Sequence, residues 1–402
     1  MRLAVVADDL TGAMDTGVQF AKCGLQTAVM LTEGELAVGE VVVVSTDSRS
    51  VTAAEAYHRT TVLGPQLTDR LVYKKIDSTM RGNIGPEIEG LLDSMGLERA
   101  LVTPSFLAAG RTVVNGFHRV HGVLLAESSF ARDPLWPATE SHVPTMLARQ
   151  SKRAVGHLAV SVVEEGSQAV MRALAAEPAP IVAADAASAS HLQTLASALV
   201  ELKDTWLPCG SAGLAQEWRA ALKLVASEGV PFRWPELARP VLVVAGSRNP
   251  TTQKQLRQAA ETCELNLVAL FGPTAKERDE RQAQVLKLLD QGSNAALTTS
   301  FSAYEPGEDI RMAEALADAT VLILQKSSVA GLIITGGDTA RATCGALGAT
   351  AVQLVGEVQA GVPAGTLVSG PHDGLRVVTK AGGFGDELVV VQGIRFLRGE
   401  WR

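Results

Sequence analysis

The chain has 402 residues, of which 47% are hydrophobic, 20% are charged and only 4% are aromatic, and its net charge is −7. This composition excludes a disordered chain and a small disulfide-stapled fold, and the length predicts two or three domains. The 37 glycines are slightly more than the average share, so their positions are informative. No block of Lys or Arg stands out, which argues against a nucleic-acid partner.

The N-terminus and the cysteines predict a cytoplasmic protein. The first residues, MRLAVVADD, hold too short an apolar run for a signal peptide and are typical of a buried strand. No apolar run reaches the roughly 18 residues that a membrane-spanning helix needs, so we expect no membrane partner. The four cysteines lie far apart without a CxxC pair, which indicates reduced thiols rather than a zinc site.

The first half of the sequence alternates short apolar runs with helical stretches. The run VVVVS at Val41–Ser45 lacks in–out alternation, which is typical of parallel strands covered on both faces. Gly110–Glu127 contains three glycines and is predicted to be an irregular excursion or a hairpin. The predicted strands are Leu3–Ala7, Thr27–Leu31, Val41–Ser45, Leu71–Ile76, Ala100–Thr103, His157–Val160 and Ile181–Ala184, and the predicted helices are Ser188–Val200 and Ala212–Val225.

A proline-rich segment divides the chain. Residues 227–240 contain three prolines and no hydrophobic periodicity, which predicts a linker. After it, the predicted strands are Val241–Ala245, Asn266–Phe271, Ala295–Thr299, Gly331–Thr335, Ala351–Gly356, Thr366–Ser369 and Arg376–Thr379, and the predicted helices are Thr251–Cys263, Lys276–Gln291, Asp309–Gln325 and Asp386–Leu397. The sequence therefore predicts an α/β fold with two domains, 1–228 and 229–402, each a largely parallel sheet flanked by helices, with a cleft between them.

The standard motifs of several enzyme classes are missing. The sequence contains no GxxxxGK[ST], no GxGxxG after a strand, no HExxH and no GxSxG. A Walker-type NTPase, a standard dinucleotide site, a zinc protease of the HExxH type and an α/β-hydrolase are therefore weak interpretations. The chemistry must come from polar side chains at strand ends, where open α/β sheets bind their ligands.

Three loops that follow strands of the first half combine acidic, basic and hydroxyl side chains. Asp9 could simply cap the next helix, and Arg49 could be a solvated surface residue. Because the carboxyl ends of parallel strands meet at one sheet edge, the three loops together predict a pocket for a small, polyhydroxylated anion. The predicted substrate-binding residues are Asp8, Asp9, Arg49, Lys75, Asp77, Ser78, Thr79 and Arg81.

Glycine-rich turns follow three strands of the second half. Glycine lets backbone N–H groups approach an oxyanion closely, and a helix N-terminus adds partial positive charge. Tight turn geometry explains any one such turn, but three in one domain favour a polyphosphate site. Asp338 and Asp386 could hold Mg²⁺ or cap helices, so the metal ligands are left open. The predicted nucleotide-binding residues are Ser247, Gly336, Gly337, Asp338, Thr339, Gly382 and Gly383.

The ordered set of motifs resembles the four-carbon acid sugar kinase family nearly from end to end. The matching segments are ADDLTGAMDTG, STDSRS, KKIDSTMRGNIGPE, PSFLAAGRTVVNG, GSRNPTTQKQL, ITGGDTA and GPHDGLRVVTKAGGFGDE. The resemblance implies an N-terminal domain that binds the acid sugar and a C-terminal domain that binds ATP. It implies acid contacts from Asp9, Arg49 and the Asp77–Arg81 loop, and ATP contacts from Ser247, Gly336–Thr339 and Gly383.

The resemblance also implies the reaction, which is phosphorylation of the 4-hydroxyl of a C4 acid. Within the family the chain is most similar to members that act on D-threonate, with D-erythronate and 3-oxo-tetronate as alternatives. Met80 and the Phe106-Leu107 pair depart from the family pattern near the sugar pocket, which leaves the exact acid open. The expected partners are a small sugar acid and ATP, and a homodimer is left open.

The expected mechanism is in-line phosphoryl transfer from ATP with Mg²⁺. Arg49 and Arg81 would bind the substrate carboxylate, and Asp9 or Asp77 would act as the base. Two other classes of function are an atypical dinucleotide-dependent oxidoreductase and a non-catalytic sugar-acid binding protein. The missing dinucleotide motif disfavours the first, and the glycine turns disfavour the second.

Overall fold

The computed structural model describes residues 2–31, 39–133, 136–224, 232–270, 275–301 and 309–400. The chain forms two compact units that divide at residues 228 and 229, except that the segment carrying β2 (Thr27–Met30) belongs to the second unit. The predicted first domain, 1–228, includes this strand. β2 instead pairs antiparallel with β16 (Ala351–Gln359), from Thr27 opposite Leu354 to Met30 opposite Ala351.

The first unit is built on a parallel sheet in the order β3-β1-β4-β11-β5-β10-β9. Every residue of β1 is at most 1% exposed, so helices cover both faces of this strand, as its unbroken apolar run predicts. The strands are β1 (Leu3–Ala7), β3 (Val41–Ser45), β4 (Leu71–Lys75), β5 (Arg99–Thr103), β9 (Val155–Leu158), β10 (Ile181–Ala184) and β11 (Trp206–Gly210).

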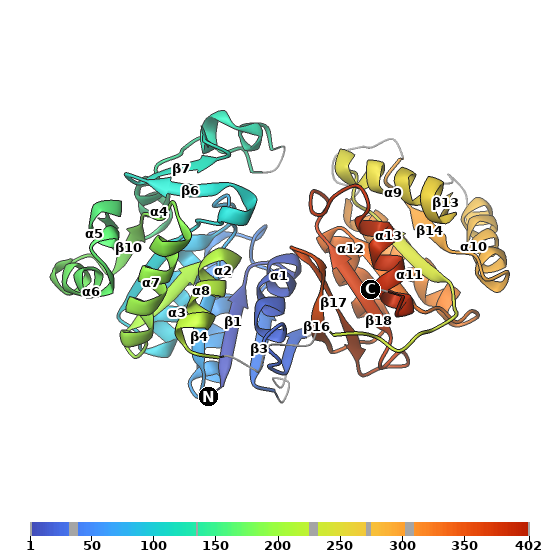
Figure 1. Cartoon of the computed structure of the whole chain (residues 1–402), viewed down its shortest axis with the longest axis horizontal. Coiled ribbons are helices and arrows are strands. Elements are labelled where there is room, and N and C mark those ends of the chain that lie inside the picture. The colour runs from blue at the N-terminus through green and yellow to red at the C-terminus, as the bar shows by residue number, and fades with distance from the viewer. Residues whose placement is uncertain are drawn as a thin grey trace. The chain divides into compact units, whose positions relative to one another are not determined.

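Helices and short 3₁₀ turns connect the strands of the first unit (Figure 1). The α-helices are α1 (Leu10–Ala21), α2 (Ala53–Leu63), α3 (Ile84–Met95), α4 (Val143–Gln150), α5 (Val160–Glu164), α6 (Ser167–Ala176), α7 (Ala189–Glu201) and α8 (Ala212–Ala221). The 3₁₀ helices are η1 (Gly64–Leu67), η2 (Leu107–Ala109), η3 (Leu125–Glu127) and η4 (Ser129–Arg132).

The glycine-rich excursion forms a small antiparallel sheet, which confirms the predicted hairpin. It consists of β6 (Arg111–Val114), β7 (Phe117–Val120) and β8 (Val123–Leu124), and β6 and β7 lie along the top of the first unit in Figure 1. Asn115 and Gly116 both have positive φ, 53° and 76°, as a tight two-residue hairpin turn requires. Their backbone N–H groups donate to the buried carboxylate of Asp185 at 2.7 and 2.8 Å, which anchors the hairpin to the strand β10 side of the unit.

The strand β11 was not predicted. Its sequence, WLPCG, contains a proline and a glycine, and proline is unusual in a central strand because it lacks a backbone donor. β11 nevertheless lies between β4 and β5, with Pro208 opposite Leu101, and all its residues are buried. Burial in the middle of the sheet therefore outweighs the local propensity at this position.

The second unit joins a parallel and an antiparallel part in one sheet. The order β13-β14-β12-β15-β18 is parallel, and β18-β17-β16-β2 is antiparallel. The strands are β12 (Val241–Ala245), β13 (Asn266–Ala269), β14 (Ala295–Thr298), β15 (Gly331–Thr335), β16, β17 (Val362–Val368) and β18 (Arg376–Lys380). The helices are α9 (Pro250–Cys263), α10 (Ala275–Asp290), α11 (Asp309–Leu324), α12 (Gly337–Ala346) and α13 (Val389–Arg398).

The predicted linker is only partly within the described residues. Residues 227–231 lie outside them, as do the predicted ends Val225 and Phe271 of two elements. Residues 232–240 form neither helix nor strand, as predicted. They pack on the second unit, because the Arg376 guanidinium lies 4.8 Å from the Trp234 ring and donates to the Pro235 carbonyl at 2.9 Å.

Candidate active site

The carboxyl ends of β1, β3 and β4 are neighbours in the first unit. β1 pairs in register with both strands, Leu3 lying opposite Val41 and Leu71. The loops that follow these strands carry Asp8 and Asp9, Arg49, and the Asp77–Arg81 segment. The structure therefore brings together the three polar loops that the sequence placed at one sheet edge.

Arg49 joins these loops through its guanidinium. Its Nε donates to Asp8 Oδ2 at 2.6 Å and its Nη2 to Asp8 Oδ1 at 3.0 Å, which makes a bidentate pair. Its Nη1 lies 2.8 Å from Asp9 Oδ2, and its Nη2 lies 3.8 Å from Asp77 Oδ1. Burial lowers the pKa of Arg49, but the three carboxylates outweigh it and raise the pKa well above the ordinary value.

Asp77 accepts hydrogen bonds from its own loop. Arg81 donates from Nε to Oδ2 at 2.8 Å and from Nη2 to Oδ1 at 3.0 Å. The Thr79 hydroxyl and the backbone N–H groups of Thr79 and Arg81 also donate to Oδ2, at 2.5, 3.2 and 3.3 Å. A carboxylate with this many donors is strongly stabilised in its ionised form. Burial raises the pKa of Asp77, but Arg49 and Arg81 overcome it and hold the pKa well below 3.8.

Asp9 has a different environment from the other two aspartates. Its Oδ1 accepts from the Gly12 backbone N–H at 2.8 Å, so it does cap α1, and its side chain remains 26% exposed. Burial and the neighbouring Asp8 raise the pKa of Asp9 more than Arg49 lowers it. Burial also raises the pKa of Asp8, but Arg49 and two lysines outweigh it there, so the pKa of Asp8 is lowered. The site therefore holds two firmly ionised aspartates and one with a raised pKa.

A fully buried ion pair lies behind this edge. Lys74 Nζ is 2.7 Å from Glu87 Oε2, and neither side chain is more than 1% exposed. The Ser48 hydroxyl donates to Glu87 Oε1 at 2.6 Å, which ties the residue before Arg49 to α3. Lys75 is 5% exposed and points to the start of α1, because a Cβ on Gly12 would lie 3.0 Å from its Nζ. Within the described part of the chain the Lys75 ammonium has no hydrogen bond or ion pair.

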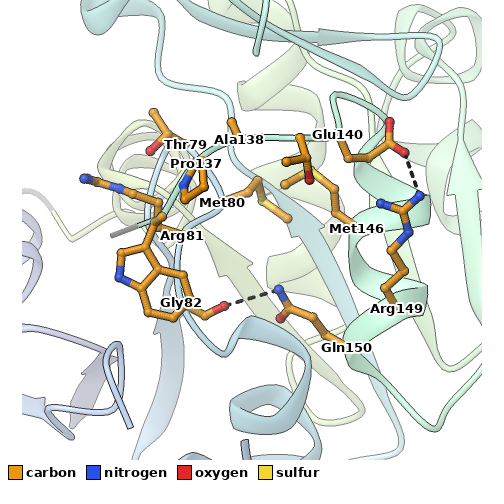
Figure 2. A pocket seen from close by; sticks show the side chains of 12 residues that line it. Thr79, Met80, Arg81, Gly82, Pro137, Ala138, Glu140, Met146, Arg149 and Gln150 are labelled. Atoms are coloured by element: carbon orange, nitrogen blue, oxygen red, sulfur yellow. Dashed lines mark hydrogen bonds and ion pairs between the residues drawn. The ribbon is translucent and has the colours of Figure 1, made fainter. Parts of the chain in front are cut away.

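Two predicted residues of the Asp77–Arg81 loop, Thr79 and Arg81, line a pocket of about 240 Å³. Figure 2 shows the Gln150 side chain beside the Gly82 carbonyl, to which its Nε2 donates at 3.2 Å. This hydrogen bond fixes the loop that contains Gly82 against α4, because Gln150 is the last residue of that helix. Ser78 contributes its carbonyl, 2.7 Å from His118 Nε2. Asp8, Asp9 and Arg49 are not among the lining residues. The pocket is lined by Thr79, Met80, Arg81, Gly82, Trp136, Pro137, Ala138, Thr139, Glu140, Met146, Arg149 and Gln150.

The three glycine turns of the second unit converge. A Cβ on Gly382 would lie 2.2 Å from the Ser247 hydroxyl, and a Cβ on Gly246 would lie 2.0 Å from the Thr339 hydroxyl. Gly336 has a φ of 102°, which side-chain-bearing residues rarely adopt. Gly383 is exposed, and a Cβ there would lie 3.6 Å from Asn249 Nδ2. Only glycine fits the Gly246 and Gly382 positions without displacing a neighbour.

The start of α12 has the features of an anion site. Its N-cap is Gly336, which makes no side-chain capping bond, so the first-turn N–H groups of Gly337, Asp338 and Thr339 are not capped by a side chain. The N–H groups of Gly246 and Ser247 instead donate to the Thr335 carbonyl, both at 3.2 Å. The Thr335 hydroxyl is buried and has no hydrogen-bond partner among the described residues.

The described ranges hold neither a cluster of metal-ligating side chains nor a helix that could span a membrane. No group of three or more His, Cys, Asp or Glu side chains there could hold a metal ion. Asp338 is exposed in the first turn of α12, and Asp386 is exposed just before α13. Among the helices that the structure describes, none combines the length and the apolar character needed to cross a bilayer.

Comparisons with known proteins agree with this division of the chain. Residues 3–218 match a family model described as a sugar-binding N-terminal domain, and residues 242–390 match a nucleotide-binding C-terminal domain. A D-threonate kinase of Salmonella typhimurium is 34% identical, covering 99% of this chain and 98% of that protein. A D-erythronate kinase of Heliobacterium modesticaldum is 33% identical, covering 94% and 93%.

A solved structure of a Salmonella typhimurium LT2 protein has the same fold, with a TM-score of 0.85 at 24% identity over 98% of this chain and 99% of that one. The chain is thus a two-domain protein that joins a sugar-binding to a nucleotide-binding domain. It belongs to the four-carbon acid sugar kinase family.

The sequence analysis does not include Lys380 among the site residues. Lys380 is the last residue of β18 and lies beside the Gly382 turn. Its Nζ donates to the Gly382 carbonyl at 3.1 Å, and the side chain is 3% exposed. The available signal was a lysine at the end of an apolar strand, directly before a Gly-Gly pair. That signal is weak by itself, because a terminal strand lysine is usually solvated.

Replacement of Gly382 by Ala should weaken nucleotide binding. The added Cβ would displace the Ser247 hydroxyl and the Asn249 Cβ, which would lie 2.2 and 2.8 Å away. We expect the Kd for ADP to rise about tenfold or more, an effect of about 1.4 kcal/mol, as measured by calorimetry. Gly345→Ala is the matched control, because a Cβ there meets nothing within 4 Å. Unchanged ADP affinity in Gly382→Ala would contradict a nucleotide at this turn.

Proposed function

We propose that the protein transfers the γ-phosphoryl group of ATP to the 4-hydroxyl of a four-carbon sugar acid, with D-threonate as the first candidate substrate. The names of two relatives with about one third identity over nearly the whole chain support this class of substrate. The polar residues of the first unit support it independently. They combine carboxylates and hydroxyls that suit a polyol with cations that suit an acid.

The observation that carries the assignment of the base is the difference between the three aspartates. A general base must be able to take up a proton, so a carboxylate stabilised strongly in its ionised form is a poor base. Asp77 has five donors, and Arg49 binds Asp8 through two atoms. Asp9 is the aspartate whose pKa is raised by burial and by Asp8. We therefore assign the base to Asp9 rather than Asp77.

The cations of the site divide into occupied and available groups. Arg49 already forms ion pairs with Asp8 and Asp9. Arg81 forms an ion pair with Asp77, and its Nη1 lies 3.4 Å from Asp133 Oδ2. In the first unit Lys75 is a buried cation that makes no hydrogen bond or ion pair within the described ranges, although its charge acts on Asp8 and Asp9, so its ammonium is suited to the negative charge of the substrate. Arg49 and Arg81 would orient the acid with the N–H groups that their carboxylates leave free.

The nucleotide would bind at the glycine turns of the second unit. The positions where a Cβ would collide, the unpartnered Thr335 hydroxyl and the uncapped start of α12 all suit a phosphate chain. Ser247, Gly336–Thr339, Gly382 and Gly383 are the proposed contacts. Mg²⁺ usually binds through one or two carboxylates together with substrate phosphates, so Asp338 is the proposed side-chain ligand.

The reaction then needs one proton transfer by the protein. Bound ATP would supply the phosphoryl group, and Mg²⁺ would neutralise charge on its phosphates. The 4-hydroxyl oxygen forms a bond to the γ-phosphorus while the bond from that phosphorus to the β–γ bridging oxygen breaks. Asp9 accepts the hydroxyl proton, and its contact with Arg49 stabilises the carboxylate before transfer.

An assay of ADP release tests the function directly. The protein is incubated with ATP, Mg²⁺ and, separately, D-threonate, L-threonate, D-erythronate and 3-oxo-tetronate. We expect ADP above background with at least one of these acids and the highest kcat/KM with D-threonate. A preference for D-erythronate or 3-oxo-tetronate would reassign the substrate within the class. No ADP release with any of the four acids would reject the kinase proposal.

Replacement of Asp9 by Asn should remove the base and keep the fold. Asn accepts a backbone hydrogen bond at an N-cap as well as Asp does, so α1 keeps its cap. We expect kcat to fall by about 10²- to 10⁴-fold with the Kd for ATP unchanged. Asp69→Asn, on an exposed pair with Arg2, is the matched control and should keep full turnover. Near-normal turnover of Asp9→Asn would reject Asp9 as the base.

The pH dependence of kcat separates the two candidate bases. The base must be ionised to act, so turnover falls as the pH drops through its pKa. Because the pKa of Asp9 lies above 3.8 and that of Asp77 well below it, we expect the acidic limb of kcat above pH 3.8. Rates are measured from about pH 3.5 to 8, with circular dichroism as a check on the fold. Constant turnover down to pH 3.8 would assign the base to another group.

A further inference from the structure

Lys380 is a buried cation at the end of β18 in the second unit. Its side chain is 3% exposed. Its Nζ donates to two neutral oxygens, the Gly382 carbonyl at 3.1 Å and the Thr252 hydroxyl at 3.2 Å. Within the described residues no carboxylate lies within ion-pair distance of this ammonium. The positive charge of Lys380 is therefore not balanced by the described part of the chain.

Lys74 shows how the same chain balances a buried ammonium that has a structural role. Lys74 is fully buried in the first unit, and Glu87 lies 2.7 Å from its Nζ. A buried charge without a counter-ion is costly, so an uncompensated lysine inside a binding domain indicates a charge supplied from outside. Burial lowers the pKa of Lys380 to about 8, which leaves it mostly protonated at neutral pH.

Lys380 is linked to all three glycine turns, to two of them directly and to the third through Thr252. Its carbonyl accepts from the Gly336 N–H at 2.9 Å, and its Nζ reaches the Gly382 carbonyl. The Thr252 hydroxyl that it contacts lies 3.3 Å from the Ser247 hydroxyl and 2.9 Å from the Gly382 carbonyl. Lys380 and Thr252 thus hold the turns at Ser247, Gly336 and Gly382 in one arrangement.

We infer that Lys380 is the buried positive charge of the nucleotide site, whose counter-ion is the phosphate chain of the nucleotide, and that it positions the three turns that receive those phosphates. The inference rests on the nucleotide site proposed above and adds a residue that neither the motifs nor the family models assign. It explains why a lysine without a carboxylate partner is retained among glycines. It also requires that its contribution to affinity grow with the number of phosphates on the ligand.

The test compares AMP, ADP and ATP with Mg²⁺ by calorimetry on the full chain. In Lys380→Met we expect a loss of affinity that grows from AMP to ADP and ATP, with the Kd for ADP and ATP rising about tenfold or more. Lys326→Met is the matched control, because Lys326 is exposed, and it should leave all three Kd values unchanged. An equal loss for the three ligands, or no loss for ATP, would overturn the inference.

Thr252→Val separates the charge from the positioning. It removes the hydroxyl that bridges Lys380 to Ser247 and keeps the ammonium. We expect a loss of similar size for AMP, ADP and ATP, in contrast to the graded loss in Lys380→Met. A graded loss in Thr252→Val would show that the charge of Lys380 does not cause the gradient.

A measurement on the unmodified protein covers the case in which Lys380→Met does not fold. The heat of ADP binding is measured at about pH 8.5 in two buffers of different ionisation enthalpy; the last phosphate pKa is about 6, so ADP itself takes up no proton there. Bound phosphates should raise the pKa of Lys380, so we expect proton uptake on binding. No uptake would overturn the inference.

The elements around Lys380 carry few other charged groups. β15 and β17 carry no charged side chain. The charged residues on the elements nearby are Arg376 of β18 itself, Lys254, Arg257 and Glu261 of α9, Asp386 and Glu387 of the loop before α13, and Arg395 and Arg398 of α13. Failure of this test is distinguishable from failure of the proposed function. The enzymatic release of ADP with one of the four sugar acids does not depend on which group takes up a proton when ADP binds.

Discussion

The site of the first unit depends on the ion cluster around Arg49. One guanidinium contacts carboxylates from the loops after β1 and β4, and Arg49 itself follows β3. Three aspartates packed this closely would repel one another and take up protons without a cation between them. With Arg49 in place, Asp8 and Asp77 remain ionised, and Asp9 alone acquires a raised pKa. The cluster therefore holds the three loops together at this sheet edge. It also gives the three carboxylates different pKa values.

In the first unit most buried charges have a partner within the protein, with Lys75 as the exception, whereas the glycine turns of the second unit surround a lysine with neutral partners. In the first unit, Lys74 has Glu87, and Arg81 has Asp77, so most charges are balanced within the protein. In the second unit, glycines bring turns into contact, and Lys380 has only neutral partners among the described residues. A site for a small acid needs placed carboxylates and cations together. A site for a highly charged phosphate chain needs free N–H groups and positive charge, which uncapped turns and an unbalanced lysine provide.

Much of the fold could be predicted from local patterns. Unbroken apolar runs such as Val41–Ser45 and Val241–Ala245 correspond to strands with the predicted bounds, because both faces of a parallel strand are covered. The last helix begins at Val389 rather than at the predicted Asp386, because the loop from Phe384 to Asp386 is held by Gln255, which donates to all three carbonyls. The strand β11 was missed since a proline and a glycine interrupt its pattern, and only its place between two strands makes it a strand.

The sequence by itself determined the α/β class, the positions of the polar and glycine-rich loops and, by resemblance, the family. These depend on residue type and spacing along the chain, which a single sequence contains. Only the tertiary structure decided which sheet β2 joins, which aspartate has the raised pKa and which buried lysines lack an ion pair with a carboxylate. Each of these depends on residues far apart in sequence: β2 pairs with a strand more than three hundred residues away, and the pKa of Asp9 depends on Arg49 from another loop. Electrostatic environment is a property of neighbours in space, so the chemistry of the site was decided by the fold.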